Sequence, residues 1–505
     1  MRDWENNIRK VVPYTPGEQP KNTCVIKLNT NENPYPPAPG VKEVLSNFNT
    51  DDLRLYPDPR VDKLVNAIAD FYKIDSSKVF VGVGSDDVLA MIFMTFFNSK
   101  KPILFPDITY SFYDVWADML RIPYEQLPLS DDFSIVPSDY YKANGGVVFP
   151  NPNAPTGKLM PLDEIEDIIE HNQDVIVVVD EAYVDFGGES ALPLIDKYDN
   201  VIVVQTFSKS RSLAGSRVGF AMASPVLIKY LNDVKYSFNS YTMDRITIEA
   251  ATAAVKDRAY FEETTAKVIK TREWTKTELK RLGFTFCDSK SNFIFAKPAN
   301  VSATKLFEDL KADNIFVRHF SSPERINDYL RISIGTDEQM HTLIKFWRII
   351  HVKKIYLHLL ISMVPLIELR GAVPVSQVMG LPIVPSFIVC IIANMLPVPI
   401  IYLFARKVLI WGADKPIIGR FFSFCLEKGE KGGKKLQAKA GRGLFVALLL
   451  FVGIPLPGTG AWTGTLAASI LDMDFKSTVA AVMLGVLLAG MIMMIVSLAG
   501  VSIFL

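Results

Sequence analysis

Short, strongly apolar runs alternate with amphipathic stretches over residues 40–350 of the chain. Four of these runs lie at 78–83, 147–149, 175–179 and 201–204. Their apolar side chains follow one another directly instead of at every second position, which is typical of strands buried on both faces of a parallel sheet. The amphipathic stretches, such as 162–172 and 246–283, are predicted to be helices that cover this sheet. The pattern predicts an α/β domain built on a large, mainly parallel sheet.

A smaller set of elements follows at 284–348. Strand patterns at 293–295 and 330–334 enclose a helical pattern at 303–311. Their number and order are typical of a small α+β domain. We therefore expect a large domain over about 40–283, and a small domain made of the N-terminal segment together with 284–348.

The composition changes sharply after Trp347 and becomes that of a membrane protein. From 356 to 404 only Glu368 and Arg370 are charged, and from 443 to 505 only Asp472, Asp474 and Lys476 are. The stretches 479–505 and 383–404 are long enough to cross a hydrocarbon layer of about 30 Å at about 1.5 Å per residue. The sequence therefore predicts an all-α membrane domain over 353–505.

Two further apolar pieces, 355–367 and 444–454, are too short to cross and end at charge, Pro or Gly. Such segments suit re-entrant hairpins, whose irregular backbone needs protein or water around it. The loop 405–442 between the apolar blocks carries ten Lys or Arg and three acidic side chains. Positively charged loops stay on the cytoplasmic side, so we expect the N-terminal part of the chain, residues 1–350, in the cytoplasm as well.

The overall charge hides this division. The 505 residues contain 54 basic and 54 acidic side chains, but residues 351–505 hold 14 basic and 6 acidic ones, which leaves 40 and 48 for the first 350. The first part has no basic surplus for nucleic acid. Its N-terminus lacks the apolar core of a secretory signal. Four cysteines without a CxxC pair and five histidines without ligand spacing predict neither a disulfide scaffold nor a metal site.

Three strand-end motifs carry the chemistry. Lys209 lies in the run 206–219 directly after one apolar strand, Asp180 and Tyr183 follow another, and Asn153 follows a third. Ligands of doubly wound sheets bind outside the carboxyl ends of the strands, so these side chains are expected to share one crevice. An amine, a carboxylate and hydrogen-bond donors suit pyridoxal phosphate, which needs a Schiff-base partner and a protonated pyridine nitrogen.

In this order the motifs resemble the fold-type I pyridoxal-phosphate aminotransferases, and among them histidinol-phosphate aminotransferase, over about residues 10–348. The resemblance implies that Lys209 forms the Schiff base and carries protons, that Asp180 pairs with the pyridine nitrogen, and that Tyr183 binds the phenolic oxygen. Tyr110 would stack on the cofactor ring. The cofactor phosphate would be held by Thr206, Ser208, Arg217 and the backbone amides of Ser85 and Asp86, which open a helix.

One position departs from the family pattern. The family usually has PNNPTG, with the Asn before PTG reaching the phenolic oxygen, whereas this chain has Ala154 there and Asn153 one place earlier. Either Asn153 takes over the contact, or the contact is lost and Tyr183 remains as the main donor.

Substrate-side segments favour the histidinol-phosphate branch. The stretches 13–17 and 28–34, with Tyr14 and Asn31, resemble its opening segments, and 54–59 resembles the segment that sends a tyrosine, here Tyr56, to the neighbouring subunit's cofactor phosphate. A homodimer follows from the resemblance. Arg318 and Arg331 would bind the phosphate of one substrate and the carboxylates of glutamate or 2-oxoglutarate in a ping-pong transamination. Aromatic amino acid aminotransferase and threonine-phosphate decarboxylase are the alternatives.

Residues 353–505 resemble the small multidrug export family in two segments, 368–374 and 454–464. Glu368 and Arg370 are costly inside an apolar stretch, so they are either proton- or ion-pathway residues or a structural ion pair. The membrane domain is accordingly a transporter of an unknown solute, an anchor, or an uncoupled fusion partner.

Overall fold

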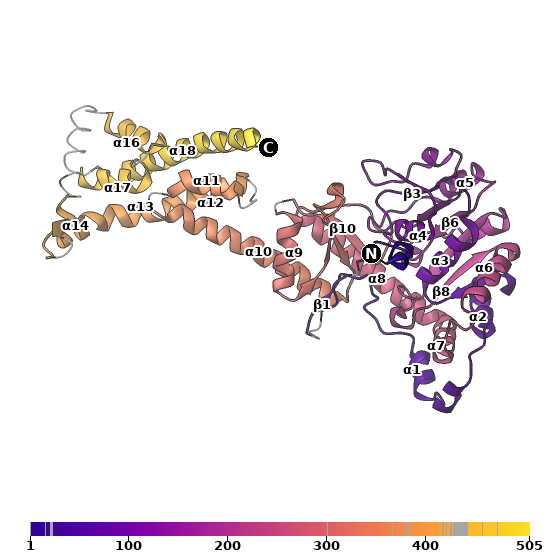
Figure 1. Ribbon diagram of the computed structural model, residues 1–505. Helices are drawn as coiled ribbons and strands as arrows, with labels where there is room; N and C mark the ends of the chain where they lie inside the picture. The colour runs from indigo at the N-terminus through magenta and orange to yellow at the C-terminus, as the bar shows by residue number, and fades with distance from the viewer. Residues whose placement is uncertain are drawn as a thin grey trace. The chain divides into compact units, whose positions relative to one another are not determined.

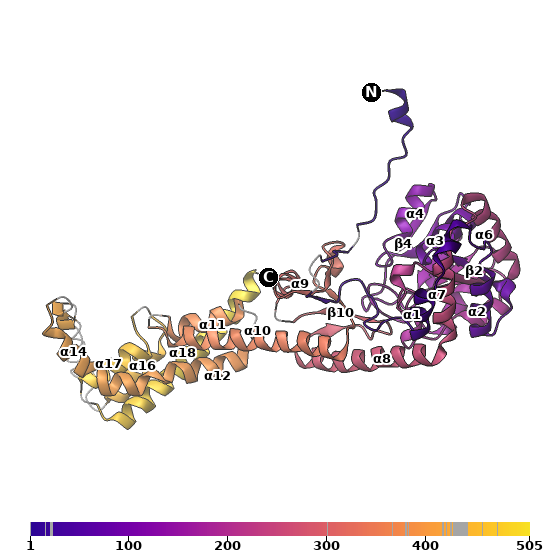
Figure 2. The ribbon, with the colours of Figure 1, turned by 90° about the horizontal axis from the view of Figure 1, so that it is seen from below.

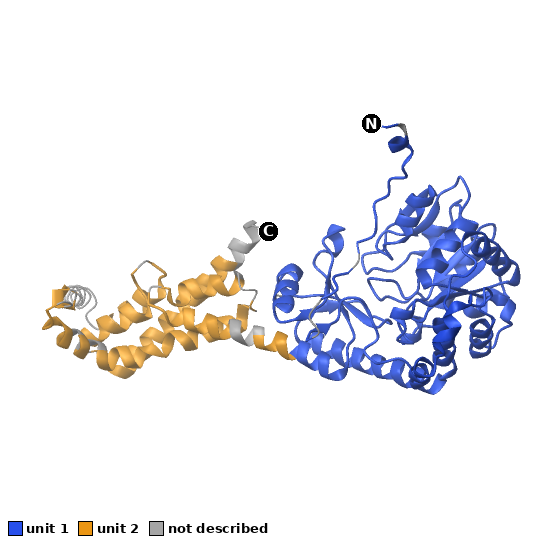
Figure 3. Cartoon of the chain, turned by 60° about the horizontal axis from the view of Figure 1, so that its bottom comes forward, with its two compact units in different colours: residues 1–344 blue, residues 345–505 orange. Residues whose placement is uncertain are grey.

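The computed structural model divides into two compact units, residues 1–344 and 345–505 (Figures 1 and 3). It describes residues 2–15, 17–20, 24–299, 301–365, 367–378, 381, 383–416, 419–420, 422–424, 427, 443–456, 458–471 and 473–504.

A seven-stranded sheet forms the centre of unit 1. Its strands, in spatial order, are β2 (Val79–Gly82), β8 (Gly219–Ala223), β7 (Val201–Thr206), β6 (Val177–Asp180), β5 (Val147–Pro150), β3 (Ile103–Pro106) and β4 (Tyr124–Leu127). All neighbours are parallel except β8, which is antiparallel to both β2 and β7. The prediction of a large, mainly parallel sheet is confirmed.

Alternate residues of these strands enter two separate cores. Val177 and Val179 belong to one buried cluster, and Val178 between them belongs to the other. Helices α2 (Asp62–Tyr72), α5 (Leu162–Glu170) and α7 (Arg245–Lys256) pack in the first cluster, while α3 (Ser85–Phe96), α4 (Tyr113–Leu120) and α6 (Pro225–Phe238) pack in the second. The apolar runs are continuous because both sheet faces are covered.

Helices α1 (Pro39–Ser46) and α8 (Arg258–Arg281) complete this unit. Helix α1 packs on α7. The predicted helical stretch 246–283 consists of two helices, because Asp257 ends α7 and caps α8 by accepting a hydrogen bond from the Tyr260 amide. Figure 2 shows α8 running along one side of unit 1.

The small domain has an antiparallel sheet in the order β12 (Arg318–His319), β13 (Leu330–Ser333), β10 (Phe293–Lys297) and β9 (Thr285–Phe286). Helix α9 (Ala303–Ala312) lies beside it, and β1 (Ile26–Lys27) pairs in parallel with β11 (Ile315–Phe316). The N-terminal segment thus joins the small domain through β1.

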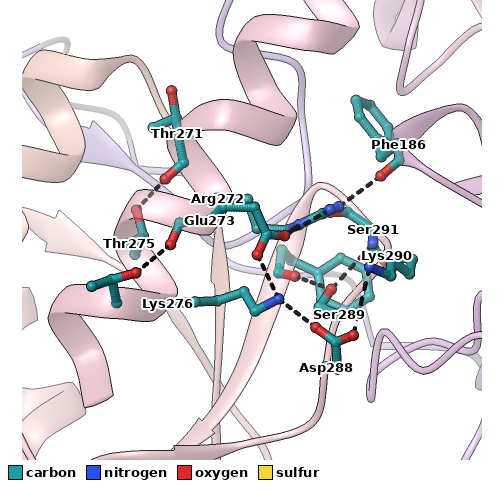
Figure 4. A network of polar contacts seen from close by, with 12 residues as sticks. Phe186, Thr271, Arg272, Glu273, Thr275, Lys276, Asp288, Ser289, Lys290 and Ser291 are labelled. Atoms are coloured by element: carbon teal, nitrogen blue, oxygen red, sulfur yellow. Dashed lines mark hydrogen bonds and ion pairs between the residues drawn. The ribbon is translucent and has the colours of Figure 1, made fainter. Parts of the chain in front are cut away.

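Arg272 of α8 ties the two domains of unit 1 together (Figure 4). Its side chain is fully buried, and it donates hydrogen bonds to the carbonyl oxygens of Phe186, at 2.7 Å, and Ser291, at 2.9 Å. Phe186 follows β6 of the large sheet and Ser291 precedes β10 of the small one. A buried guanidinium with carbonyl partners on both sides fixes the geometry between them.

Unit 2 is helical. Its elements are the end of α10 (Asp337–Met363), α11 (Glu368–Val378), α12 (Ile383–Met395), α13 (Pro397–Ile400), a π-helical turn at Ile401–Ala405, α14 (Arg406–Ala413), α16 (Leu444–Gly453), α17 (Ala461–Ile470) and α18 (Phe475–Phe504). Two stretches, Ile383–Phe404 and Phe475–Ser497, are helical, long and apolar enough to cross a membrane. The first matches its predicted range, and the second begins before the predicted residue 479.

The junction between the units lies inside α10, which continues through 351–354 without a break. The predicted short apolar pieces correspond to the end of α10 and to α16. Re-entrant hairpins stay a prediction, and most of the basic loop 405–442 falls outside the described residues.

Candidate active site

The carboxyl ends of β5, β6 and β7 form one edge of a pocket of about 180 Å³. Parallel pairing sets Pro150 opposite Asp180, and Asp180 opposite Val204, so the segments after these strands emerge side by side. The pocket is lined by nine of the residues that the sequence singled out: Ser85, Asp86, Tyr110, Asp180, Tyr183, Thr206, Ser208, Lys209 and Arg217. Thr30, Glu32 and Ala154 also line it.

Lys209 extends into this pocket from the turn after β7. Its Nζ lies 3.4 Å from the carbonyl oxygen of Thr30 and 5.6 Å from the centroid of the Tyr183 ring. The side-chain amide of Asn33 donates to the carbonyl oxygens of Lys209, at 2.9 Å, and Ser210, at 3.3 Å. The N-terminal segment therefore holds the lysine-bearing turn in place, which suits an amine that must meet its partner in one geometry.

Asp180 is a buried carboxylate in need of a positive partner. It accepts hydrogen bonds from the Tyr113 hydroxyl at 2.9 Å and the Ala182 amide at 3.3 Å. Burial raises the pKa of Asp180 to about 6, and these two hydrogen bonds only partly oppose the effect. A protonated pyridine nitrogen would compensate the buried charge, so this residue fits pyridoxal phosphate.

Arg217 and Tyr110 meet at the carboxylate of Asp86. Arg217 Nη2 lies 2.8 Å from Asp86 Oδ2, and the Tyr110 hydroxyl donates to Asp86 Oδ1 at 2.6 Å. Gly84, which precedes α3, has a φ of +92°, and a Cβ there would lie 2.5 Å from Arg217 Nη2. The absence of a side chain at Gly84 lets the guanidinium approach the start of α3.

The first amides of α3 and the hydroxyls after β7 line the same end of the pocket. Ser85 and Asp86 are the first residues of α3, where backbone N–H groups lack helical partners. The Thr206 hydroxyl lies 3.0 Å from the Ser208 hydroxyl. Amides, hydroxyls and a guanidinium around one helix N-terminus make a donor set that fits a phosphate group.

Asn153 does not line the pocket, whereas Ala154 does. Its Nδ2 donates to the Ile108 carbonyl at 3.0 Å, and its Oδ1 accepts from the Thr109 hydroxyl at 3.2 Å. Both ends of the amide are therefore engaged within the protein. Of the two alternatives for the PNAPTG turn, this geometry favours the one in which Tyr183 is the main donor to the phenolic oxygen.

The remaining predicted residues do not line the pocket. Arg318 and Arg331 lie on β12 and β13, and Tyr14 stacks on Phe112 with ring centroids 4.3 Å apart. Asn31 is buried and donates to the Tyr183 hydroxyl at 3.0 Å. Tyr56 is 77% exposed and contacts Tyr241 instead of the pocket.

Sequence reasoning missed three residues that hold this site. Tyr113 donates to Asp180, Asn33 holds the Lys209 turn, and Ser333 bonds Asn31. Tyr113 stands three residues after Tyr110, and Asn33 lies in the quoted segment 28–34, so both were within reach of the motifs. Ser333 gave no separate signal.

Glu368 of unit 2 binds the start of α17, and Arg370 binds the turn before this helix. The two carboxylate oxygens of Glu368 accept from the amides of Ala461 and Trp462, each at 3.1 Å. Arg370 donates to the Thr459 hydroxyl at 2.7 Å and to the Leu456 carbonyl. Glu368 therefore accepts from the first two amides of α17, and Arg370 donates to the turn that precedes them.

Family comparisons agree with both parts of the chain. Residues 23–346 match the family described as "Aminotransferase class I and II", and residues 368–492 match the family described as "Putative small multi-drug export protein". Histidinol-phosphate aminotransferase of Lactococcus lactis subsp. cremoris (strain MG1363) is 52% identical over 343 residues, which are 68% of this chain and 96% of that protein.

Two further relatives extend the comparison. Histidinol-phosphate aminotransferase of Clostridium beijerinckii is 50% identical over 69% of this chain and 97% of its own length. A crystal structure of histidinol-phosphate aminotransferase from Sinorhizobium meliloti, in complex with pyridoxal-5'-phosphate, is 25% identical with a TM-score of 0.58, and the match covers 64% of this chain and 91% of that one. The chain therefore belongs to the class I and II aminotransferase family, within its histidinol-phosphate aminotransferase branch, and carries a small multidrug export domain after the enzyme.

Proposed function

We propose that residues 1–350 transfer the amino group of histidinol phosphate to 2-oxoglutarate with pyridoxal phosphate as cofactor. The observation that carries this proposal is the identity of 50–52% to histidinol-phosphate aminotransferases over nearly their whole length. The pocket supports it with an amine, a buried carboxylate and an anion-binding helix start. We assign about 40–283 to the large domain, and 284–348 with the N-terminal segment to the small domain.

Each pocket residue has a role in this proposal. Pyridoxal phosphate, when bound, supplies an aldehyde that condenses with amines and a ring that accepts electrons from the substrate carbon. Asp180 holds a proton on the pyridine nitrogen, Tyr183 donates to the phenolic oxygen, and Tyr110 packs on the ring. Thr206, Ser208, Arg217 and the amides of Ser85 and Asp86 bind the phosphate.

Lys209 also performs the acid-base step. Its Nζ would hold the cofactor in the resting enzyme. When the substrate is bound, the Lys209 amine would take the proton from the carbon that bears the amino group. Because the Lys209 turn is held by Asn33, this amine stays within reach of the reacting carbon.

Arg331 and Arg318 bind the anionic groups of the two substrates. Guanidinium forks match phosphate and carboxylate, so the same pair serves histidinol phosphate in one half-reaction and glutamate or 2-oxoglutarate in the other. Tyr14 is held in place by stacking on Phe112 and lies near Arg331, which supports a place for Tyr14 beside the substrate.

We further propose that the enzyme is a homodimer. Tyr56 is largely exposed and lies outside the pocket of its own chain, which leaves it available to a neighbouring subunit's cofactor phosphate.

The enzyme assignment is tested with the full chain purified in detergent. Wild type is expected to show the visible absorbance of covalently held cofactor and to convert histidinol phosphate with 2-oxoglutarate. Lys209→Ala should lose both, while Lys197→Ala, which removes an exposed lysine paired with Glu166, should lose neither. Activity with aromatic amino acids but not with histidinol phosphate would refute the substrate, and decarboxylation of threonine phosphate would favour the other alternative.

The membrane domain, 353–505, is proposed to lie in a lipid bilayer with the enzyme on the cytoplasmic side. The two apolar helices and the basic loop support this placement. Because Glu368 binds the first amides of α17 and Arg370 binds the turn before it, we favour a structural role for both. Solute flux into vesicles that falls in Glu368→Gln would instead favour transport, and equal background flux in both proteins would favour an anchor.

A further inference from the structure

Asn31 connects the small domain to the tyrosine of the cofactor pocket. Its side chain is 1% exposed and does not line the pocket. Its Nδ2 lies 3.0 Å from the Tyr183 hydroxyl, and its Oδ1 lies 3.0 Å from the hydroxyl of Ser333 on β13. The side-chain amide of Asn292 also donates to the backbone carbonyl of Asn31 at 2.9 Å. All polar groups of Asn31 are thus engaged inside the protein, which leaves its amide poorly suited to contact a substrate.

The hydrogen bonds fix which end of the Asn31 amide faces Tyr183. The Asn31 backbone N–H donates to Ser333 Oγ at 2.9 Å, so the single Ser333 proton is free to be donated to Asn31 Oδ1. With the amide reversed, the buried Ser333 proton would have no acceptor among the described residues. Nδ2 therefore points at Tyr183 and donates to it.

A hydroxyl that accepts from Asn31 keeps its own proton for another partner. Tyr183 Oη carries one proton, and within the described residues it donates to no protein group. Its ring is held edge-on by Phe293, with centroids 5.0 Å apart. The tyrosine proton is consequently directed to the pocket, where Lys209 and Asp180 lie.

The backbone of Asn31 suits this task. Its φ of +56° is in the left-handed region, which Asn tolerates better than most residues. This turn brings the side chain between β13 and Tyr183.

We propose that Asn31 is a positioning residue, which with Ser333 makes Tyr183 an obligatory hydrogen-bond donor to the phenolic oxygen of the cofactor. This inference rests on the proposed function, in which Tyr183 makes that contact. A hydrogen-bond donor stabilises the ionised phenolic oxygen of the cofactor. It thereby lowers the pKa of the Lys209 nitrogen that is bonded to the cofactor, which we call the linkage pKa. Asn31 would set this pKa without touching the cofactor.

The test is a pH titration of the visible absorbance of the purified holoenzyme. Asn31→Asp keeps the shape of the side chain but replaces its donor with an acceptor, so the Tyr183 proton should turn to Asp and away from the cofactor. The linkage pKa is then expected to rise by roughly one pH unit, as for the loss of one hydrogen bond to a charged group. Tyr183→Phe should give a similar rise, and the double variant should exceed neither single variant by much.

Two more variants protect the test against misfolding. Asn31→Gly removes the side chain while keeping the left-handed backbone accessible, and should raise the pKa by less than Asn31→Asp. Ser289→Ala is the matched control, because it deletes another fully buried serine hydroxyl of the small domain (Figure 4) that bonds only local backbone. It should leave the titration unchanged.

The outcomes separate the inference from the proposed function. A rise in Tyr183→Phe with none in Asn31→Asp or Asn31→Gly would overturn the role of Asn31 alone. No rise in Tyr183→Phe would overturn both the proposed contact of Tyr183 and this inference.

Discussion

Arg318 and Arg331 are cross-strand partners on β12 and β13, and their guanidinium carbons each lie 5.7 Å from the ring centroid of Phe320. Burial, together with the charge of Arg318, lowers the pKa of Arg331. Arg331 Nη2 donates to the Asn29 carbonyl at 3.1 Å, but its Nε is buried without a partner. Neither arginine has a carboxylate partner in the part of the chain that the structure describes. Two neighbouring guanidinium groups without a carboxylate repel each other, so the binding of an anionic ligand between them would be favourable.

Arg331→Lys is expected to raise KM for both histidinol phosphate and glutamate. Lysine keeps the charge but loses the fork, and one charged hydrogen bond accounts for roughly a tenfold to hundredfold change in binding. Arg318→Lys should also raise KM, but by less, because no carbonyl of the described residues accepts a hydrogen bond from Arg318. Steady-state kinetics of each half-reaction measure this. Arg325→Lys, at an arginine of the small domain that binds the Leu129 and Ser130 carbonyls, is the control and should leave KM unchanged.

Asp180→Asn is expected to weaken cofactor binding and to lower kcat by roughly a hundredfold to several thousandfold. The amide keeps the size of the carboxylate but removes the buried charge that would pair with the pyridine nitrogen, and breaking one partner of a buried pair costs about 3–5 kcal/mol. Cofactor affinity from absorbance and kcat from coupled assays measure the two effects. Tyr113→Phe removes only one hydrogen bond to Asp180 and should cost far less. Equal losses in both variants would contradict the role of the charge.

Much of the large domain could be predicted because its valine runs are buried on both faces and leave no alternative to a covered sheet. The strand-end motifs predicted the pocket for the same reason, since parallel strands bring Asp180, Tyr183 and Lys209 to one edge. The antiparallel direction of β8 could not be read from its residues, because an apolar strand looks the same in either direction.

Contacts between distant segments were harder to predict. Asn31 resembled a substrate-binding residue by its position in the family motif, but its bond to Tyr183 depends on β13 supplying Ser333, some 300 residues away. The change of composition after Trp347 indicated a boundary, but it did not indicate that one helix, α10, continues through it. The contact of Asn31 follows from tertiary packing and not from local pattern.

Gly84→Ala is expected to weaken pyridoxal phosphate binding. The φ of +92° strains any residue with a Cβ, and the new methyl group would lie 2.5 Å from Arg217 Nη2, so the guanidinium must move from its place beside α3. Equilibrium binding of the cofactor should show an affinity lower by roughly tenfold, as for the loss of one hydrogen bond to a charged group. Gly215→Ala, where a Cβ meets nothing within 4 Å, is the control. Unchanged affinity in Gly84→Ala would show that Arg217 does not need this approach.

Glu181→Gln is expected to remove a pH dependence of stability. Glu181 is buried and accepts from Ser190, Ala191 and Gln205, yet burial raises its pKa from 4.5 to about 7. The folded protein therefore binds a proton that the unfolded chain releases between these values. The resulting stability is fully present below pH 4.5 and is lost as the pH rises to about 7.

Urea denaturation of wild type and Glu181→Gln at several pH values measures this effect. The shift corresponds to about 3 kcal/mol, so the free energy of unfolding of wild type, relative to the variant, should fall by up to that amount between pH 4.5 and 7 and stay constant above. Glutamine at this position loses some of the hydrogen bonds that Glu181 accepts, which lowers the stability of the variant at every pH. This loss does not change how the difference in stability depends on pH. Two parallel stability curves would mean that Glu181 stays ionised in the folded protein, because its three donors would then outweigh its burial.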